Sequence, residues 1–120
     1  MDEYLIISTS VDLVRSLSEE VVFIQADGNY SSLHFTHNRQ NTVTLQLGQI
    51  ERNIALQLPQ TGTNFIRIGK SLIINRKYVS YINLARQMLI LNANDGQAHS
   101  LSASREALKQ LKELIEREQK

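Results

Sequence analysis

The sequence has no cysteine among its 120 residues, which excludes disulfide bonds, thiolate nucleophiles and zinc sites built on cysteine. No apolar run approaches the ~20 residues that a membrane-spanning helix requires. The N-terminus, Met1 to Tyr4, is acidic where a secretory signal would be basic, and the apolar run 5–7 is too short for the core of such a signal. We therefore expect a cytoplasmic protein that has no membrane partner.

Acidic residues are missing from a long segment in the second half of the chain. Between Arg52 and Asn94 there is no Asp or Glu, and six residues are basic, which gives a charge of +6. The remainder holds seven basic and twelve acidic residues, a charge of −5, so the net charge of +1 hides an uneven distribution. Such a segment can attract a polyanion, although it can also be an ordinary solvated face.

Short segments rich in β-branched and aromatic residues predict a mainly β protein, that is, a β-dominated α+β domain. We expect about eight to ten short strands in small sheets, by the spacing of turn signals. Outside the central stretch described below, strands are expected at 4–9, 11–15, 21–26, 30–36, 42–47, 81–85, 88–91 and 97–101. The connections between them are a polar turn at 16–20, a hairpin turn at 27–29, a polar connector at 37–41 and a hairpin loop at 92–96. The length fits a single domain, 1–120, with a core from about residue 5 to 115.

Two helices are expected, one short and central and one at the C-terminus. In the first, apolar residues at Leu47, Ile50, Ile54 and Leu58 follow at spacings of three, four and four, and Pro59 ends the helix. The second begins after Ser102 or Ser104, either of which can cap it. Its apolar stripe is Ala107, Leu108, Leu111, Leu114 and Ile115.

The stretch 64–79 predicts an exposed hairpin. Residues 65–70 alternate as in a half-buried strand, and 72–74 are aliphatic enough for a strand that is covered on both faces. A bend at 69–71 would carry Lys70 at its tip. The second strand would close with an exposed basic turn at 75–77.

Gly69, Lys70 and Ser71 resemble the end of a phosphate-binding loop, but the surrounding sequence does not fit that motif. Its first glycine would fall at Asn64, and residues 72–74 look like a strand where the motif needs a helix. Nucleotide binding is therefore disfavoured.

The three histidines give no sign of a metal or catalytic site. His34 and His37 would face opposite sides of a strand, and His99 stands alone. A Ser-His-Asp group could be drawn from Ser32, His34 and Asp27, yet no glycine-flanked serine elbow is present. We expect no enzyme activity, no metal, no cofactor and no small-molecule substrate.

Three blocks, taken in order, resemble the LytTR domain, the DNA-binding module of LytR/AlgR-type bacterial response regulators. They are Val22 to Tyr30 (VFIQADGNY), Phe65 to Asn75 (FIRIGKSLIIN) and Leu101 to Arg105 (LSASR). The resemblance implies short strands in small sheets, with loops that enter successive major grooves of duplex DNA.

Carried over from the family, the base-contacting positions are Asn29, Lys70 and Arg105. Lysine and arginine can donate to guanine, and asparagine can pair with adenine. Plausible phosphate contacts are Arg39, Arg76 and Lys77. Each base-contacting residue also has an ordinary alternative: Lys70 as a solvated turn lysine, Arg105 as a helix-start residue packed on the sheet, and Asn29 as a residue chosen for its turn conformation.

One residue departs from the family pattern, because Gly69 stands where the family usually has histidine, and this predicts a looser local backbone. No receiver domain fits in the chain. The resemblance predicts a two-component transcription regulator that binds promoter repeats as a homodimer or as paired copies, since one small module makes too little contact for typical specific affinity. The alternative is a protein-interaction module that has kept the fold and lost DNA binding.

Overall fold

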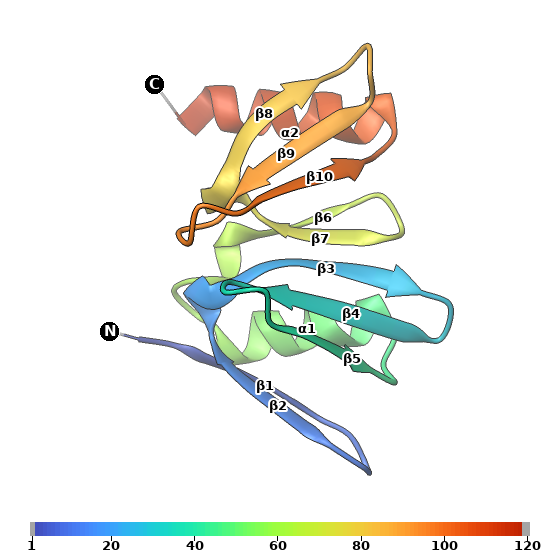
Figure 1. Cartoon of the computed structure of the whole chain (residues 1–120), viewed down its shortest axis with the longest axis vertical. Helices are drawn as coiled ribbons and strands as arrows, with labels where there is room; N and C mark the ends of the chain where they lie inside the picture. Colours follow the sequence, from blue (N-terminus) through green and yellow to red (C-terminus); the bar gives the residue numbers. More distant parts are fainter. Residues whose placement is uncertain (1, 119–120) are drawn as a thin grey trace.

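The structure is a computed structural model that describes residues 2–118, within which the chain forms ten strands and two α-helices (Figure 1). The strands are β1 (Tyr4–Ser8), β2 (Leu13–Leu17), β3 (Val21–Asp27), β4 (Tyr30–Phe35), β5 (Gln40–Val43), β6 (Phe65–Ile68), β7 (Leu72–Asn75), β8 (Val79–Asn83), β9 (Met88–Asn92) and β10 (Ala98–Ser102). The α-helices are α1 (Leu47–Gln57) and α2 (Arg105–Glu118), and the single 3-10 turns are η1 (Ser18–Glu20), η2 (Gly62–Asn64) and η3 (Arg76–Tyr78). The mainly β fold with a central and a C-terminal helix is as expected.

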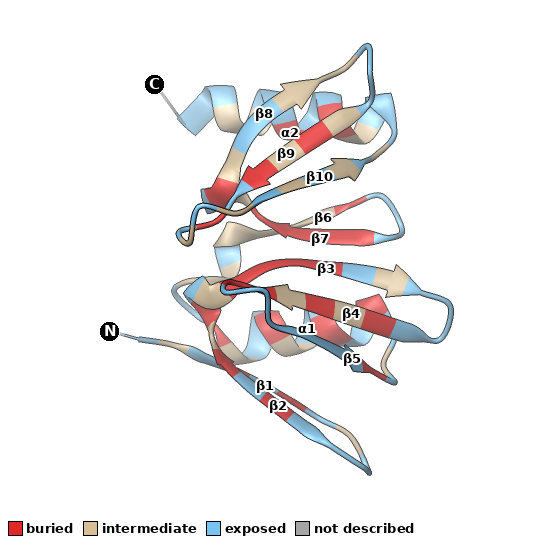
Figure 2. Ribbon diagram, viewed as in Figure 1, coloured by how far each residue is buried: buried red, intermediate tan, exposed pale blue. Residues whose placement is uncertain are grey.

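A five-stranded antiparallel sheet, in the order β5-β4-β3-β7-β6, lies between two layers (Figure 1). One face packs against α1 and the two-stranded β1–β2 ribbon, and these elements form the first core. The other face packs against α2 and the three-stranded sheet β10-β9-β8, and these elements form the second core. Because the middle sheet is covered on both faces, its central strands read as continuous apolar runs, and β7 is buried along its whole length (Figure 2).

A β-bulge in β3 lets neighbouring residues serve different cores. The register of β3 with β4 shifts between Val21 and Phe23, so Val22 and Phe23 both enter the second core. Val21 and Ile24 enter the first core. One extra residue thus changes which face the side chains occupy, as bulges do.

The helices follow their apolar periodicity. In α1, Leu47, Ile50 and Ile54 are buried in the first core, and Leu58, also buried, immediately precedes Pro59. In α2, the Oγ of Ser104 accepts a hydrogen bond from the Ala107 N–H at 3.1 Å, so Ser104 is the capping serine.

Three strand boundaries and one turn differ from expectation. The strand expected at 81–85 is β8 (Val79–Asn83), which starts two residues earlier, directly after η3. The strand expected at 11–15 is β2 (Leu13–Leu17), because Thr9 and Asp12 bond to each other and hold residues 9–12 as the hairpin turn. The strand expected at 42–47 starts earlier, at β5 (Gln40–Val43), since positive φ angles at His37 and Asn38 allow a tight turn. Asn75, expected in an exposed turn, is 1% exposed.

Candidate nucleic-acid interface

Two hairpin turns lie at the same end of the five-stranded sheet. Strand pairing fixes this arrangement, because Gln25 is opposite Leu72 and Ile68 is opposite Leu72, one or two residues from each turn. Asn29 lies in the β3–β4 turn and Lys70 in the β6–β7 turn, and both are exposed. The sheet register therefore places both predicted base contacts on one edge.

The start of α2 lies at that same edge (Figure 1). We define the tip edge as the segments 27–30, 69–71 and 103–106. In Figure 1 these three segments follow one another along the longest axis of the molecule, which extends 42 Å. Arg105 is the first residue of α2 and is exposed. All three residues predicted to contact bases are thus brought to one side.

The position of Arg105 is unfavourable for helix stability. A cation at a helix N-terminus faces the positive end of the helix dipole, which costs about 0.3–1 kcal/mol at an exposed site. Glu106 in the same turn offsets this cost. Arg105 makes no ion pair among residues 2–118, so its guanidinium is available to an external acceptor.

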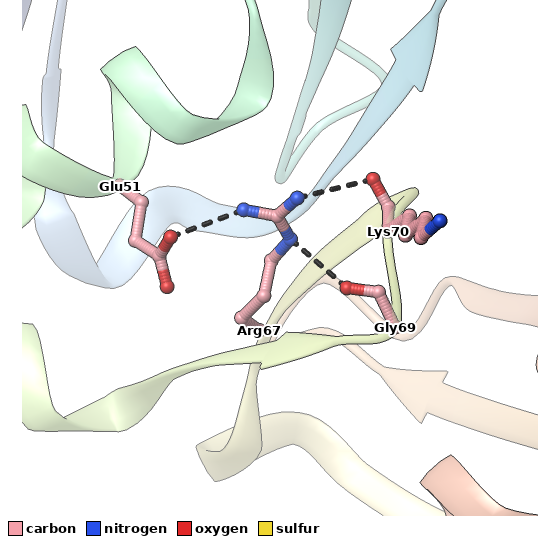
Figure 3. Close-up of polar contacts among 4 residues, drawn as sticks. All are labelled: Glu51, Arg67, Gly69 and Lys70. Atoms are coloured by element: carbon pink, nitrogen blue, oxygen red, sulfur yellow. Dashed lines mark hydrogen bonds and ion pairs between the residues drawn. The ribbon is translucent and has the colours of Figure 1, made fainter.

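The β6–β7 turn is held by Arg67 (Figure 3). Its Nε donates to the Gly69 carbonyl at 3.1 Å, and its Nη2 donates to the Lys70 carbonyl at 3.2 Å. Its Nη1 pairs with Glu51 of α1 at 3.0 Å. The Lys70 side chain points away from this cluster. In place of the looser backbone expected at Gly69, the structure shows both tip carbonyls bound to one guanidinium.

Glycine at position 69 suits the turn itself. Its φ is +60°, in the left-handed region that favours glycine, and an added Cβ would meet no atom within 4 Å. Backbone conformation, and not lack of space, therefore restricts this position.

The predicted phosphate contacts lie at the opposite ends of the strands. Arg39 follows β4 at the end where Val21 pairs with Phe35, and Arg76 and Lys77 follow β7 beyond Ile74. Arg39 stacks 4.0 Å from the Phe35 ring, and Arg76 pairs with Glu118 near the end of α2. Lys77 is exposed. The structure does not bring these three residues to the tip edge.

Two of the three histidines, His34 and His99, pack between the two sheets. His34 stacks on Phe23 with ring centroids 4.1 Å apart, and His99 of β10 meets the same ring edge-on at 5.4 Å. Burial lowers the pKa of His34 below its ordinary value, and His99 lowers it further. His37 lies in the β4–β5 turn, where its N–H donates to Asp95. Within residues 2–118 no group of three acidic or histidine side chains is placed to hold a metal ion.

Arg67 is one of the six basic residues in the segment without Asp or Glu and belongs to the family block Phe65 to Asn75. Neither pattern predicted that it holds the β6–β7 turn. The aromatic-to-arginine spacing before the glycine was the available signal. Tyr30, expected at the start of a strand and at the end of the first family block, is 50% exposed beside Asn29 and also belongs to the tip edge. None of the helices in the described part of the chain has the length and apolar character to cross a bilayer.

Comparison with known proteins agrees with this architecture. The family model described as the LytTr DNA-binding domain matches residues 13–116. Among solved structures, the chain is similar to the LytTr DNA-binding domain assigned to a methyl-accepting/DNA response regulator from Bacillus cereus, with a TM-score of 0.63 and 16% sequence identity. That match covers 94% of this chain and 96% of the other. A comparison with curated proteins gave no significant match.

Proposed function

The chain belongs to the LytTR DNA-binding domain family, and from this premise we propose that it binds duplex DNA sequence-specifically through the tip edge, as a LytR/AlgR-type transcription regulator in the bacterial cytoplasm. The observation that carries the proposal is the alignment of three exposed segments on one edge. Asn29, Lys70 and Arg105 are the proposed base contacts. Their donors match the acceptors that guanine and adenine present in the major groove.

The arrangement suits a duplex that runs along the longest axis of the molecule. The three segments of the tip edge follow one another along that axis (Figure 1), so they can lie together along one face of such a duplex. Two copies on repeated half-sites then supply enough contact for typical specific affinity.

The phosphate contacts are the less supported part of the proposal. The phosphate contacts predicted for Arg39, Arg76 and Lys77 remain predictions. The strand register places these residues at the opposite edge, where a straight duplex on the tip edge would not reach them. Lys109, exposed one turn after Arg105 in α2, is better placed to neutralise a phosphate there.

Alanine variants of one residue from each edge test the assignment after a binding sequence has been selected from a random duplex library. Arg105→Ala should weaken binding to the selected site by about 1–3 kcal/mol and relax the preference at one base position. Lys77→Ala is the matched control from the opposite edge. If it contacts phosphate, it should weaken all sequences alike and reduce the salt slope by about 1.

The outcomes separate the proposal from its rival. If both variants lose the same binding free energy on every sequence, Arg105 does not contact a base. If the protein retains no duplex even at low salt, where phosphate attraction is strongest, the result would favour the rival function, a protein-interaction module with a LytTR fold.

A further inference from the structure

Aspartate is followed by glycine at two places in the sequence, Asp27–Gly28 and Asp95–Gly96. In such a pair the glycine nitrogen can attack the aspartate side chain, because glycine has no side chain of its own to obstruct the approach. Both pairs lie at hairpin connections, the first between β3 and β4 and the second between β9 and β10. An added Cβ at either glycine would meet no atom within 4 Å, so both connections have room for the attack.

Hydrogen bonds hold both reacting groups of the Asp95–Gly96 pair. The Asp95 carboxylate accepts from the N–H of Gln97 at 3.0 Å and from the N–H of His37. These bonds lower the pKa of Asp95 below its ordinary value, which keeps the carboxyl group charged and therefore unreactive toward a nucleophile. The Gly96 N–H donates to the Ala93 carbonyl at 3.0 Å, so the attacking nitrogen is also engaged.

The Asp27–Gly28 pair has none of these restraints. Asp27 is exposed, and its carboxylate forms no hydrogen bond or ion pair with the rest of the described chain, residues 2–118. Asp27 pairs with Tyr30, so a two-residue turn, with a φ of +62° at Gly28, closes the hairpin. The closing hydrogen bonds of such a turn join the two flanking residues, which leaves the Gly28 N–H with no carbonyl acceptor in this part of the molecule. The carboxyl group and the attacking nitrogen are therefore both unoccupied.

We propose that Asp27 isomerises spontaneously to isoaspartate, and that this modification weakens DNA recognition by the β3–β4 turn. The Gly28 nitrogen attacks the carbon of the neutral side-chain carboxyl group. The carboxyl group loses its hydroxyl and the nitrogen loses its proton, so one water leaves and a succinimide ring forms. A water molecule then adds to the main-chain carbonyl of the ring, the bond from that carbon to the nitrogen breaks, and the nitrogen stays bonded to the side-chain carbon. Because one water leaves and one returns, the reaction needs no other reactant.

The modification changes the backbone of the turn that carries Asn29. One more carbon enters the main chain between residues 27 and 28, and a carboxylate is left as a short side group. Since a two-residue turn fixes the register of its strands, the pairing of Asp27 with Tyr30 cannot be kept. This consequence rests on the proposed function, because it matters only if Asn29 contacts a base. The modified protein should then bind the selected duplex about fivefold or more weakly.

Ageing of the purified protein at mildly acidic pH, which favours the neutral carboxyl group, tests the modification. Peptide mapping with a protease that cleaves before aspartate, but not before isoaspartate, measures each position separately. Each hydrogen bond at the Asp95–Gly96 pair slows the reaction about fivefold, because it must open first, so residue 27 should convert at least about tenfold faster than residue 95. In urea, where neither pair is held, the two rates should be similar. A residue 27 that converts no faster than residue 95 in the folded protein would overturn the assignment.

The Kd for the selected duplex, measured by fluorescence anisotropy, tests the consequence. Aged wild-type protein should lose affinity in proportion to the fraction of residue 27 that has converted. Asp27→Glu keeps the charge, but its longer side chain disfavours ring closure, so the aged variant should bind as its own fresh sample does. Treatment of the aged wild type with an isoaspartyl methyltransferase, which re-forms the succinimide and returns part of it as aspartate, should restore part of the affinity.

The two parts of the inference fail separately. If residue 27 converts and the Kd stays constant, the modification does not affect DNA recognition. If aged Asp27→Glu loses as much affinity as the aged wild type, the loss comes from a different change. Absence of binding by the fresh wild type would instead refute the proposed function, whereas conversion of residue 27 is measured without DNA and remains a separate result.

Discussion

Removing the Arg67 guanidinium should disorder the β6–β7 turn while the rest of the fold persists. Arg67→Ala deletes three hydrogen bonds, two to the carbonyls of Gly69 and Lys70 and one to Glu51. The turn has no other side chain bound to its carbonyls within residues 2–118. We therefore expect Lys70 to sample several positions where the wild type holds one.

The magnitude follows from exposure. A hydrogen bond from a charged donor contributes about 1.5–3 kcal/mol when buried. The Arg67 side chain is 30% exposed, so in the variant water can bind the carbonyls that the guanidinium has left. We therefore expect each of these two hydrogen bonds to contribute about 1 kcal/mol to the stability of the turn. The pair with Glu51, whose side chain is 52% exposed, adds at most about 1 kcal/mol. If the binding-competent turn falls to between a third and a tenth of the population, the apparent Kd rises about three- to tenfold.

Fluorescence anisotropy with the selected duplex, measured over a range of salt, is the assay. Arg67→Ala should raise Kd without changing the salt slope, because the guanidinium is bound to the turn carbonyls and Glu51 and we expect it to contact no phosphate. Glu51→Gln keeps an acceptor for Nη1 and should stay near wild type. A salt slope reduced by about 1 would show that Arg67 itself neutralises a phosphate, and an unchanged Kd would show that the turn needs no support.

Two further predictions concern stability. Asn75→Ala should lower the free energy of unfolding in urea by about 2 kcal/mol, because the buried amide donates to the Val21 carbonyl at 3.0 Å and accepts from the Lys77 N–H at 3.1 Å; a loss below about 0.5 kcal/mol would contradict this. Since burial and His99 lower the folded-state pKa of His34, the unfolded chain binds the proton first as pH falls through about 6.5. Stability should therefore decrease from pH 7.5 to 5.5 by chemical denaturation, and less so in His34→Gln; an equal decrease in both proteins would assign the effect elsewhere.

The parts of the fold that periodicity controls were predictable from the sequence. The run 72–74 predicted a strand covered on both faces, and the spacing of Leu47, Ile50 and Ile54 predicted α1. The displaced boundaries of β2 and β5 depend on turns that apolar periodicity does not report. Thr9 bonds to Asp12, and His37 takes a positive φ without being glycine. Such turns are fixed by local polar bonds that several residue types can make.

The candidate site, like the fold, has one part that local sequence patterns predict and another that depends on contacts between distant residues. Turn signals at Gly28 and Gly69 located two of the tips, because positive φ is a local requirement. Placing both tips on one edge depends on pairing between β3 and β7, which are about fifty residues apart in the chain. The Arg67–Glu51 and Arg76–Glu118 pairs are also nonlocal, so the sequence could not show that one arginine supports a tip while the other lies at the far edge.

The spacing between the tips is set by packing remote from them. Asn29 and Lys70 belong to the five-stranded sheet, whereas Arg105 follows the three-stranded sheet. The two sheets meet through the second core, where Phe23 contacts His99. Because interiors are close-packed, a change of volume at this contact shifts one sheet against the other and moves Arg105 relative to both hairpin turns. In the DNA-binding mode proposed above, recognition therefore depends on core residues that lie away from the tip edge.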